Sequence, residues 1–160
     1  MRVLIVSDSH GRTDHLKKAV ELVKPDHMLH LGDAEGQEDY IESFCGCPLD
    51  IVRGNCDYMS RLPAQKVVAL GKHKIFMAHG HLHYVKGGLC EIENSARDNG
   101  ADVVLYGHTH LPELVYEPDG MIVVNPGSIS YPRQEGRRPC YAVLNIDEEG
   151  EYRFSLCQLR

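Results

Sequence analysis

Five short motifs contain most of the side chains in this chain that could do chemistry. They are Asp8-Ser9-His10-Gly11, Gly32-Asp33, Gly54-Asn55-Cys56-Asp57, His79-Gly80-His81 and Gly107-His108-Thr109-His110. Taken singly, each such Asp or His is more often a helix cap or a packed residue than a ligand. Together they supply carboxylate, imidazole and amide groups, which suit Mn²⁺, iron, cobalt, nickel or Zn²⁺.

Seven of these residues are candidate metal ligands: Asp8, His10, Asp33, Asn55, His79, His108 and His110. Seven ligands exceed what one tetrahedral zinc ion uses, but they suit two ions that share a bridging carboxylate. Two such ions activate water and neutralise the charge of a phosphoryl group that is being transferred. The pattern therefore favours metal-assisted phosphoester hydrolysis.

Each motif directly follows a predicted strand. Short β-rich runs predict these five strands at 2–7, 27–31, 49–53, 74–78 and 102–106. Amphipathic spacing and Pro or Gly stops predict helices at 14–24, 37–44 and 88–99. The remaining strands are expected at 66–70, 113–117, 121–124, 141–146 and 151–156. The alternating opening is typical of a parallel sheet, and loops that leave one sheet edge would gather the motifs.

Composition excludes several classes of protein. The 160 residues are 42% hydrophobic, which predicts one α/β domain over 1–160 with two sheets. Seventeen basic against 23 acidic residues give a net charge of −6, and Lys17-Lys18 and Arg137-Arg138 are only isolated pairs. We therefore expect no extended nucleic acid as partner. No run approaches the roughly 18 apolar residues of a membrane span, so no membrane partner is expected.

The cysteines indicate the cellular compartment. Six cysteines occur without a C-x-x-C pair, and the chain does not open with a secretory signal pattern. We therefore expect reduced thiols in a cytoplasmic protein. The sequence is compatible with a homo-oligomer but does not define one.

The order of the five motifs resembles that of the calcineurin-like metallophosphoesterase superfamily, whose pattern is D-x-H, GD, GN-H-D/E, H and GH-x-H. The short length, the His79-Gly80-His81 tripeptide, and Asn125-Pro126-Gly127-Ser128 with Pro132-Arg133 resemble its small prokaryotic phosphodiesterase branch. The resemblance extends from residue 3 to about residue 146. It implies an α/β sandwich of two mixed β-sheets flanked by helices, with a dinuclear metal site at one end.

The resemblance also implies roles for the ligands. Metal one would be held by Asp8, His10, Asp33 and His110, and metal two by Asp33, Asn55, His79 and His108. Asp33 would bridge the ions, and a hydroxide between them would attack phosphorus. Mn²⁺ is the expected ion, with Ni²⁺, Mg²⁺, iron and Zn²⁺ as alternatives.

The chain departs from the family pattern at Cys56, where much of the superfamily has a His regarded as the general acid. Cys56 could be a weak acid, a spectator or a packed residue, and the spectator is favoured. Asp57 matches the acidic position that would orient its neighbours. His81 is a candidate to contact phosphate or donate a proton, and Arg12 and Arg133 are candidate phosphate contacts.

The leading hypothesis is a divalent-metal phosphodiesterase that hydrolyses a small phosphodiester. A phosphomonoesterase or nucleotide pyrophosphohydrolase with the same metals is the second hypothesis. The third is a protein-binding scaffold like the retromer subunit that this fold resembles. A scaffold would not need seven polar residues at one rim, which argues against this third hypothesis.

Overall fold

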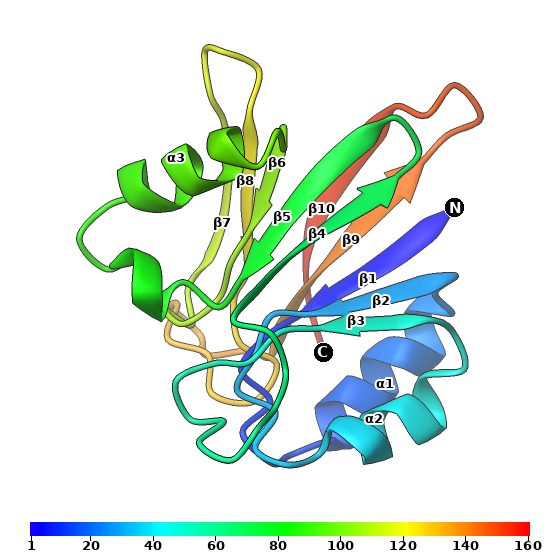
Figure 1. The fold of residues 1–160 in the computed structure, drawn as a ribbon. Helices are drawn as coiled ribbons and strands as arrows, with labels where there is room; N and C mark the ends of the chain where they lie inside the picture. The colour runs from blue at the N-terminus through cyan, green and yellow to red at the C-terminus, as the bar shows by residue number, and fades with distance from the viewer.

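Ten strands form two mixed sheets that pack face to face in the computed structural model, which describes all 160 residues (Figure 1). The strand order is β10-β9-β1-β2-β3 in the first sheet and β4-β5-β6-β8-β7 in the second. The first sheet contains β1 (Arg2–Val6), β2 (His27–His30), β3 (Leu49–Ile51), β9 (Cys140–Ile146) and β10 (Tyr152–Gln158). The second contains β4 (Gln65–Leu70), β5 (His73–Ala78), β6 (Val103–Leu105), β7 (Pro112–Tyr116) and β8 (Ile122–Pro126).

The alternation of side chains along β1 shows why both faces of the first sheet are buried. Val3 and Ile5 belong to the core between the two sheets, together with residues of β5 and β6. Leu4 and Val6 belong to a second core on the outer face of the first sheet. Because successive side chains of a strand point to opposite faces, an unbroken apolar run is what a strand covered on both faces requires.

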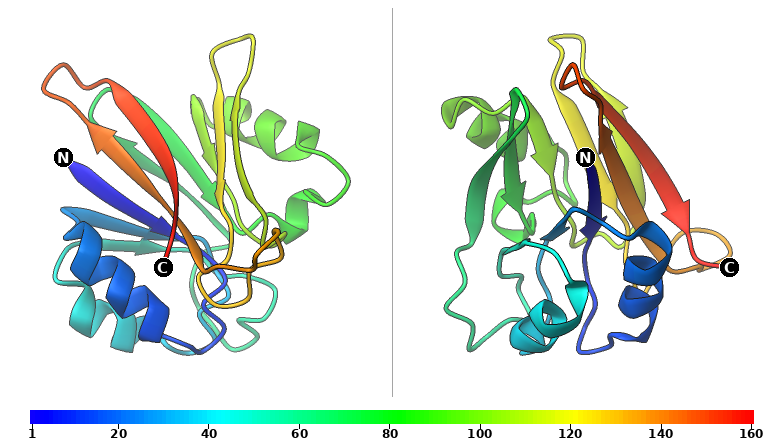
Figure 2. Two further views of the ribbon diagram at one scale, coloured as in Figure 1. Left: turned by 180° about the vertical axis from the view of Figure 1, so that it is seen from behind. Right: turned by 90° about the vertical axis from the view of Figure 1, so that its right-hand side faces the viewer.

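Helices cover the outer face of each sheet (Figure 2). Helices α1 (Asp14–Val23) and α2 (Glu38–Cys45) pack on the first sheet, and Leu16 and Ala19 of α1 share a core with residues of β1. Helix α3 (Cys90–Asp98) packs Ile92 and Ala96 against the second sheet. The predicted sandwich of two mixed β-sheets flanked by helices is thereby confirmed.

Parallel strands aim their carboxyl ends at the candidate site. Strands β1, β2 and β3 run parallel to one another in the first sheet, as do β5, β6 and β8 in the second. The five motifs follow β1, β2, β3, β5 and β6. The loops that carry them therefore come from both sheets rather than from the edge of one.

The predicted elements are all present, with differences at their ends. The strands expected at 49–53 and 102–106 are shorter, Leu49–Ile51 and Val103–Leu105, because the next residues already turn into the site loops. A short 3₁₀-helix, η1 (His81–His83), follows the fourth motif and was not predicted. None of the helices has the length and apolar character needed to span a membrane.

His30, at the end of β2, is fully buried and forms hydrogen bonds to the loops after β1 and β2. Its Nε2 lies 3.0 Å from Ser9 Oγ, and its Nδ1 accepts a 3.2 Å hydrogen bond from the Gly32 backbone N–H. Burial lowers the pKa of His30 to about 4. The imidazole is therefore neutral in the folded protein at neutral pH.

We expect His30 to make the protein acid-sensitive. Between pH 6.5 and about 4 the unfolded chain protonates this group and the folded chain does not, so stability falls as the pH falls. Between pH 7 and pH 4.5 this one group costs about 2 kcal/mol of unfolding free energy. Urea unfolding in chelator-containing buffer should show that the wild type has the higher unfolding free energy at pH 7. Its advantage over His30→Gln should shrink by that amount when the pH is lowered to 4.5. A gap that stays constant with pH would contradict this role.

Candidate metal centre

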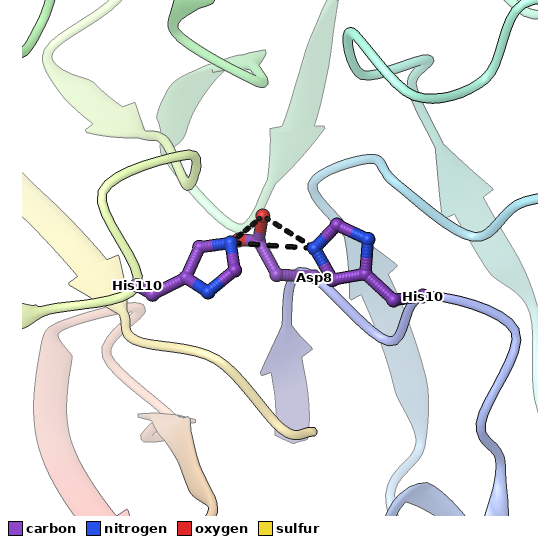
Figure 3. A group of neighbouring side chains, drawn as sticks. All are labelled: Asp8, His10 and His110. Carbon is purple, nitrogen blue, oxygen red and sulfur yellow. Dashed lines mark hydrogen bonds and ion pairs between the residues drawn. The ribbon is translucent and has the colours of Figure 1, made fainter. Parts of the chain in front are cut away.

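Three side chains from opposite sheets meet at the centre of the candidate site (Figure 3). Asp8 Oδ1 lies 3.0 Å from His110 Nε2 and 3.7 Å from His10 Nε2. The two imidazoles point at each other, with their Nε2 atoms 3.3 Å apart. One carboxylate and two imidazoles thus converge within the reach of a single ion.

A second group lies directly beside the first. Asp33 Oδ2 is 3.3 Å from His79 Nε2 and 3.8 Å from His10 Nε2. His79 Nε2 also lies 3.8 Å from Asp8 Oδ1 and 3.1 Å from Asn55 Oδ1. Both carboxylates therefore lie between His10 on one side and His79 on the other.

Hydrogen bonds at the Nδ1 atoms fix which nitrogen of each histidine faces the centre. His79 Nδ1 donates to the Leu31 carbonyl and His110 Nδ1 to the Tyr131 carbonyl, each at 2.7 Å. His10 Nδ1 donates to Glu35 Oε1, also at 2.7 Å. Because a carbonyl or carboxylate oxygen only accepts, the proton is on Nδ1, and each Nε2 is left to hold a second proton or a metal ion.

The electrostatics of the site favour positive charge at these Nε2 atoms. The side chains of Asp8 and His79 are fully buried, and Asp33 is 2% exposed. Although burial opposes it, the Asp33 and Asp8 carboxylates raise the pKa of His79. Burial also opposes ionisation of Asp33, but His79 holds the pKa of Asp33 well below its usual range. The site is therefore arranged to keep two carboxylates ionised next to a cation.

The donor set fits divalent cations. Asp8 Oδ1 is buried and accepts no hydrogen bond, which is costly for a carboxylate oxygen unless a cation compensates it. Two unprotonated nitrogens 3.3 Å apart, such as those of His10 and His110, repel unless a proton or a metal ion lies between them. The Asp and His side chains thus form a cluster that is able to bind metal ions.

The ligand-bearing loops are held by side chains that point away from the centre. The Asp57 carboxylate accepts hydrogen bonds from the backbone N–H groups of Asp33, Glu35 and Gly54, at 2.6–2.8 Å. Ser128 Oγ donates to the Asp8 carbonyl at 2.9 Å. Asp57 therefore lies where it orients the second and third motifs, not among the converging atoms.

The backbone at the site is strained. Nine residues other than glycine have a positive φ, and six of them lie in the site loops: Asp8, His10, Asp33, Glu35, His108 and His110. A residue with a side chain pays on the order of 1 kcal/mol or more for this left-handed conformation. Such strain persists only where the surrounding contacts determine the conformation, as the hydrogen bonds of Asp57 and Ser128 do here.

Two glycines allow the loops to cross at close range. A Cβ at Gly54 would lie 2.0 Å from Asp33 Oδ1, and one at Gly107 would lie 2.0 Å from Ser7 Oγ and 2.9 Å from Asp8 Oδ2. Any larger residue at either position would displace a carboxylate of the centre. These glycines are required by space rather than by backbone conformation.

The other predicted site residues lie around this centre. The ring of His108 is 5.2 Å from that of His79, and its backbone N–H donates to Asp8 Oδ2. The ring of His81 lies 5.4 Å from that of His79, and its buried Nδ1 has no partner. The Cys56 backbone N–H donates to Asp33 Oδ1, while its thiol contacts the Asn55 amide.

Of the two arginines predicted to contact phosphate, Arg133 lines the pocket at the site and Arg12 does not. Arg133 lines an open pocket of about 980 Å³ together with His10 and His110. Arg12 does not line this pocket; its guanidinium lies over the ring of Tyr131, 4.7 Å from the centroid. Arg133 is therefore the better placed of the two.

Sequence reasoning missed several residues that position the site. Glu35 holds His10, and Asn125 Nδ2 donates to the Gly107 carbonyl and to Thr109 Oγ1. An acid two residues after Asp33 and the Asn125–Ser128 segment were the available signals for Glu35, Asn125 and Ser128. The carbonyl groups of Leu31 and Tyr131 left no signal, since every residue has a carbonyl.

Comparison with known proteins places the chain among phosphoesterases. Residues 1–149 match the family model described as calcineurin-like phosphoesterase superfamily domain. The probable metallophosphoesterase YsnB of Bacillus subtilis is 35% identical over 155 residues, 93% of this chain and 86% of that protein. A predicted phosphoesterase from Streptococcus pneumoniae has a TM-score of 0.83 at 30% identity, covering 98% of this chain and 88% of that one.

A likeness in fold alone extends to Vps29. Vps29 of Entamoeba histolytica, solved with Zn²⁺, has a TM-score of 0.78 at 21% identity, and the match covers 99% of both chains. The fold is therefore shared between chains described as phosphoesterases and Vps29.

We expect Gly107→Ala to damage the centre specifically. The added Cβ collides with Ser7 Oγ and approaches Asp8 Oδ2, which should cost about 1–3 kcal/mol of unfolding free energy and weaken metal binding. Gly87→Ala is the matched control, since its φ is not positive and the nearest atom is 3.4 Å from the new Cβ. Chemical unfolding and metal titration compare the two. Equal behaviour of both variants would contradict the proposed close approach.

Proposed function

Because the chain belongs to the calcineurin-like phosphoesterase superfamily, we propose that it is a divalent-metal-dependent phosphodiesterase acting on small phosphodiesters. The observation that carries the proposal is the buried cluster of Asp8 and Asp33, at which the Nε2 atoms of three histidines are aimed. Family membership supports phosphoester hydrolysis in general. The preference for a diester and the roles of single residues belong to the proposal.

Two overlapping ligand sets are proposed within the cluster. Asp8, His10, Asp33 and His110 would hold one ion, and Asp33, Asn55, His79 and His108 the other. The position of Asp33 Oδ2, within 3.8 Å of both His10 and His79, supports its role as the bridge. Ions bound there would supply a water of lowered pKa and positive charge facing the phosphate. Several imidazole ligands favour Mn²⁺ over Mg²⁺, which prefers oxygen.

The chain's own residues would hold and orient the reacting groups. Glu35 and the carbonyls of Leu31 and Tyr131 keep the Nδ1 protons in place, so that the Nε2 atoms stay free to bind metal. Arg133 would donate to the phosphate oxygens from the pocket beside His10 and His110. Arg12 would assist from its position over Tyr131, and His81 would approach the leaving group from the side of His108.

The openness of the site favours a diester. A phosphodiester has substituents on both sides of phosphorus, and the pocket of about 980 Å³ leaves room for the second one. Burial and the nearby Asp33 carboxylate raise the pKa of the Cys56 thiol to about 11 in the metal-free protein. A thiol is also a weaker acid than an imidazolium, so Cys56 is a poorer proton donor than the His usual at this position. Substrates whose leaving group needs no proton should therefore react fastest.

Two alternatives remain to be tested. A phosphomonoesterase or nucleotide pyrophosphohydrolase would use the same ligands, and a panel of mono- and diesters separates these activities. A protein-binding scaffold receives weight from the fold shared with Vps29. A scaffold would hydrolyse no phosphoester with any added metal, whereas an enzyme would hydrolyse at least one of them.

Metal removal and return provide the direct test of the function. Chelator should abolish hydrolysis of bis-nitrophenyl phosphate, and Mn²⁺ should restore it at least as well as Mg²⁺. Elemental analysis of the reloaded protein should give two ions per chain. Activity that persists after complete metal removal would refute the proposal.

Variants of the ligands test how the two ions are shared. Asp33→Asn should lower the affinity for both ions because it removes the charge that both would contact. Asn55→Ala should lower the affinity for the second ion only. Metal titration by calorimetry separates the two sites. Loss of both ions in Asn55→Ala would count against the assignment.

Substitution of Cys56 tests its predicted role as a spectator. Cys56→Ala should leave the rate on bis-nitrophenyl phosphate nearly unchanged, since nitrophenolate leaves without a proton. Cys56→His should raise rates on alkyl or nucleoside esters, by less than the ~10²–10⁴-fold of a fully oriented general acid. A general loss of activity in Cys56→Ala with both metals still bound would show that the thiol participates.

A further inference from the structure

Arg137 lies between the candidate site and a second pocket. It lines the open pocket that contains His10, His110 and Arg133. It also lines a pocket of about 440 Å³ formed by residues of α1, the loop after β8 and the end of the chain. The residues of this second pocket are His15, Lys18, Arg137, Arg138, Pro139, Leu159 and Arg160. The two pockets therefore share one arginine as a lining residue.

The charge of this region is strongly positive. No Asp or Glu lines the second pocket, to which Arg160 brings both its guanidinium and the terminal carboxylate, and the first pocket contains only Glu35, which is engaged by His10. None of the Lys or Arg side chains that line either pocket forms an ion pair. Elsewhere in the molecule Lys66, Lys72 and Arg97 are paired with Asp50, Glu151 and Asp119.

Folding gathers these charges from separate segments. Helix α1 supplies His15 and Lys18, and the loop between β8 and β9 supplies three arginines, Arg133, Arg137 and Arg138. Both views in Figure 2 show the C-terminus close to α1 and to this loop. We call His15, Lys18, Arg133, Arg137 and Arg138 the basic strip. In a chain of net charge −6, an uncompensated basic strip that begins at the candidate site calls for an anionic ligand.

We propose that the basic strip binds further phosphate groups of the substrate, so that the preferred substrate carries at least one phosphate beyond the scissile one. The inference rests on the proposed function and deepens it. Guanidinium groups bind phosphate oxygens with two parallel hydrogen bonds, and Lys adds a point charge. The additional phosphates occupy the side of the site next to His10 and His110.

The required chemistry is a row of phosphates at the spacing of a short chain. A single-stranded oligonucleotide of a few residues supplies it through phosphodiester links. A dinucleoside polyphosphate supplies it through phosphoanhydride links, and its cleavage would be the pyrophosphohydrolase alternative. The expectation against an extended nucleic acid rested on the absence of a basic run in the sequence. The strip arises from residues more than a hundred positions apart, which such a search does not detect.

Binding of a labelled oligonucleotide tests the strip independently of catalysis. Fluorescence anisotropy measures the Kd of a nuclease-resistant phosphorothioate pentathymidylate for the metal-loaded protein over a range of salt concentrations. Lys18→Ala/Arg138→Ala should raise the Kd about tenfold at low salt. It should also reduce the slope of log K against log salt by about 1.4, since each lost phosphate contact removes about 0.7.

The matched control is Lys72→Ala/Arg153→Ala, which removes two positive charges outside the strip. It should change the Kd less than twofold and leave the slope unchanged. Equal effects of the two double variants would show attraction by net charge alone and would overturn the proposal. Thermal unfolding checks that both variants are folded.

Turnover distinguishes the source of the phosphates. The ratio of kcat/KM for a substrate with additional phosphates to that for bis-nitrophenyl phosphate should fall in the strip variant. If the ratio falls for pentathymidylate, the strip binds the phosphates of an oligonucleotide. If it falls for diadenosine tetraphosphate, the strip binds those of a dinucleoside polyphosphate. If neither substrate is preferred and neither binds more weakly to the strip variant, the inference is wrong. Failure to hydrolyse any phosphodiester would refute the proposed function, while the binding experiment would still decide the strip.

Discussion

Two buried carboxylates, Asp8 and Asp33, both lie within 4 Å of His10 and of His79. Much of the surrounding structure serves to keep both carboxylates ionised. An unpaired charge in a protein interior costs several kcal/mol, and two close together also repel. The imidazoles offset this cost only when a proton or a metal ion lies at Nε2, because their Nδ1 protons are held by outer partners and their Nε2 atoms face the oxygens. Asp33 gains a further hydrogen bond from the Cys56 backbone N–H. Positive charge at the centre is therefore a condition of this packing.

The loops meet this condition at the expense of backbone strain. Six site residues have left-handed conformations, and each is hydrogen-bonded to a residue of another loop. Asp57 holds the second motif against the third, and Ser128 holds the first from the segment after β8. These hydrogen bonds between loops restrict the positions of the candidate ligands, and a metal centre requires its ligands to be held within about 0.5 Å. Glycine is necessary where the loops come closest, as at Gly54 and Gly107.

Sequence predicted the strands and the converging motifs because both depend on local signals. β-rich runs mark buried strands, and polar residues with glycine directly after them mark loops at strand ends. The 3₁₀-helix at His81–His83 escaped prediction because three residues have no helical period. Glu35 and the Tyr131 carbonyl could not be assigned, since their role depends on which imidazole lies nearby. The basic strip was hidden because its charges come together only in three dimensions.

The distribution of the proposed ligands over both sheets would determine when metal can be acquired. His10 and His110, one hundred residues apart, face each other only after β1 and β6 have taken their places in two different sheets. A nascent chain that ends before β6 carries Asp8, His10, Asp33 and His79 without His108 and His110. Under the proposed assignment, the first ion would therefore be taken up only after both sheets have formed. That ion would meet the oxygen and nitrogen donors of the folded site, and not the six thiols that an unfolded chain would offer to softer metals.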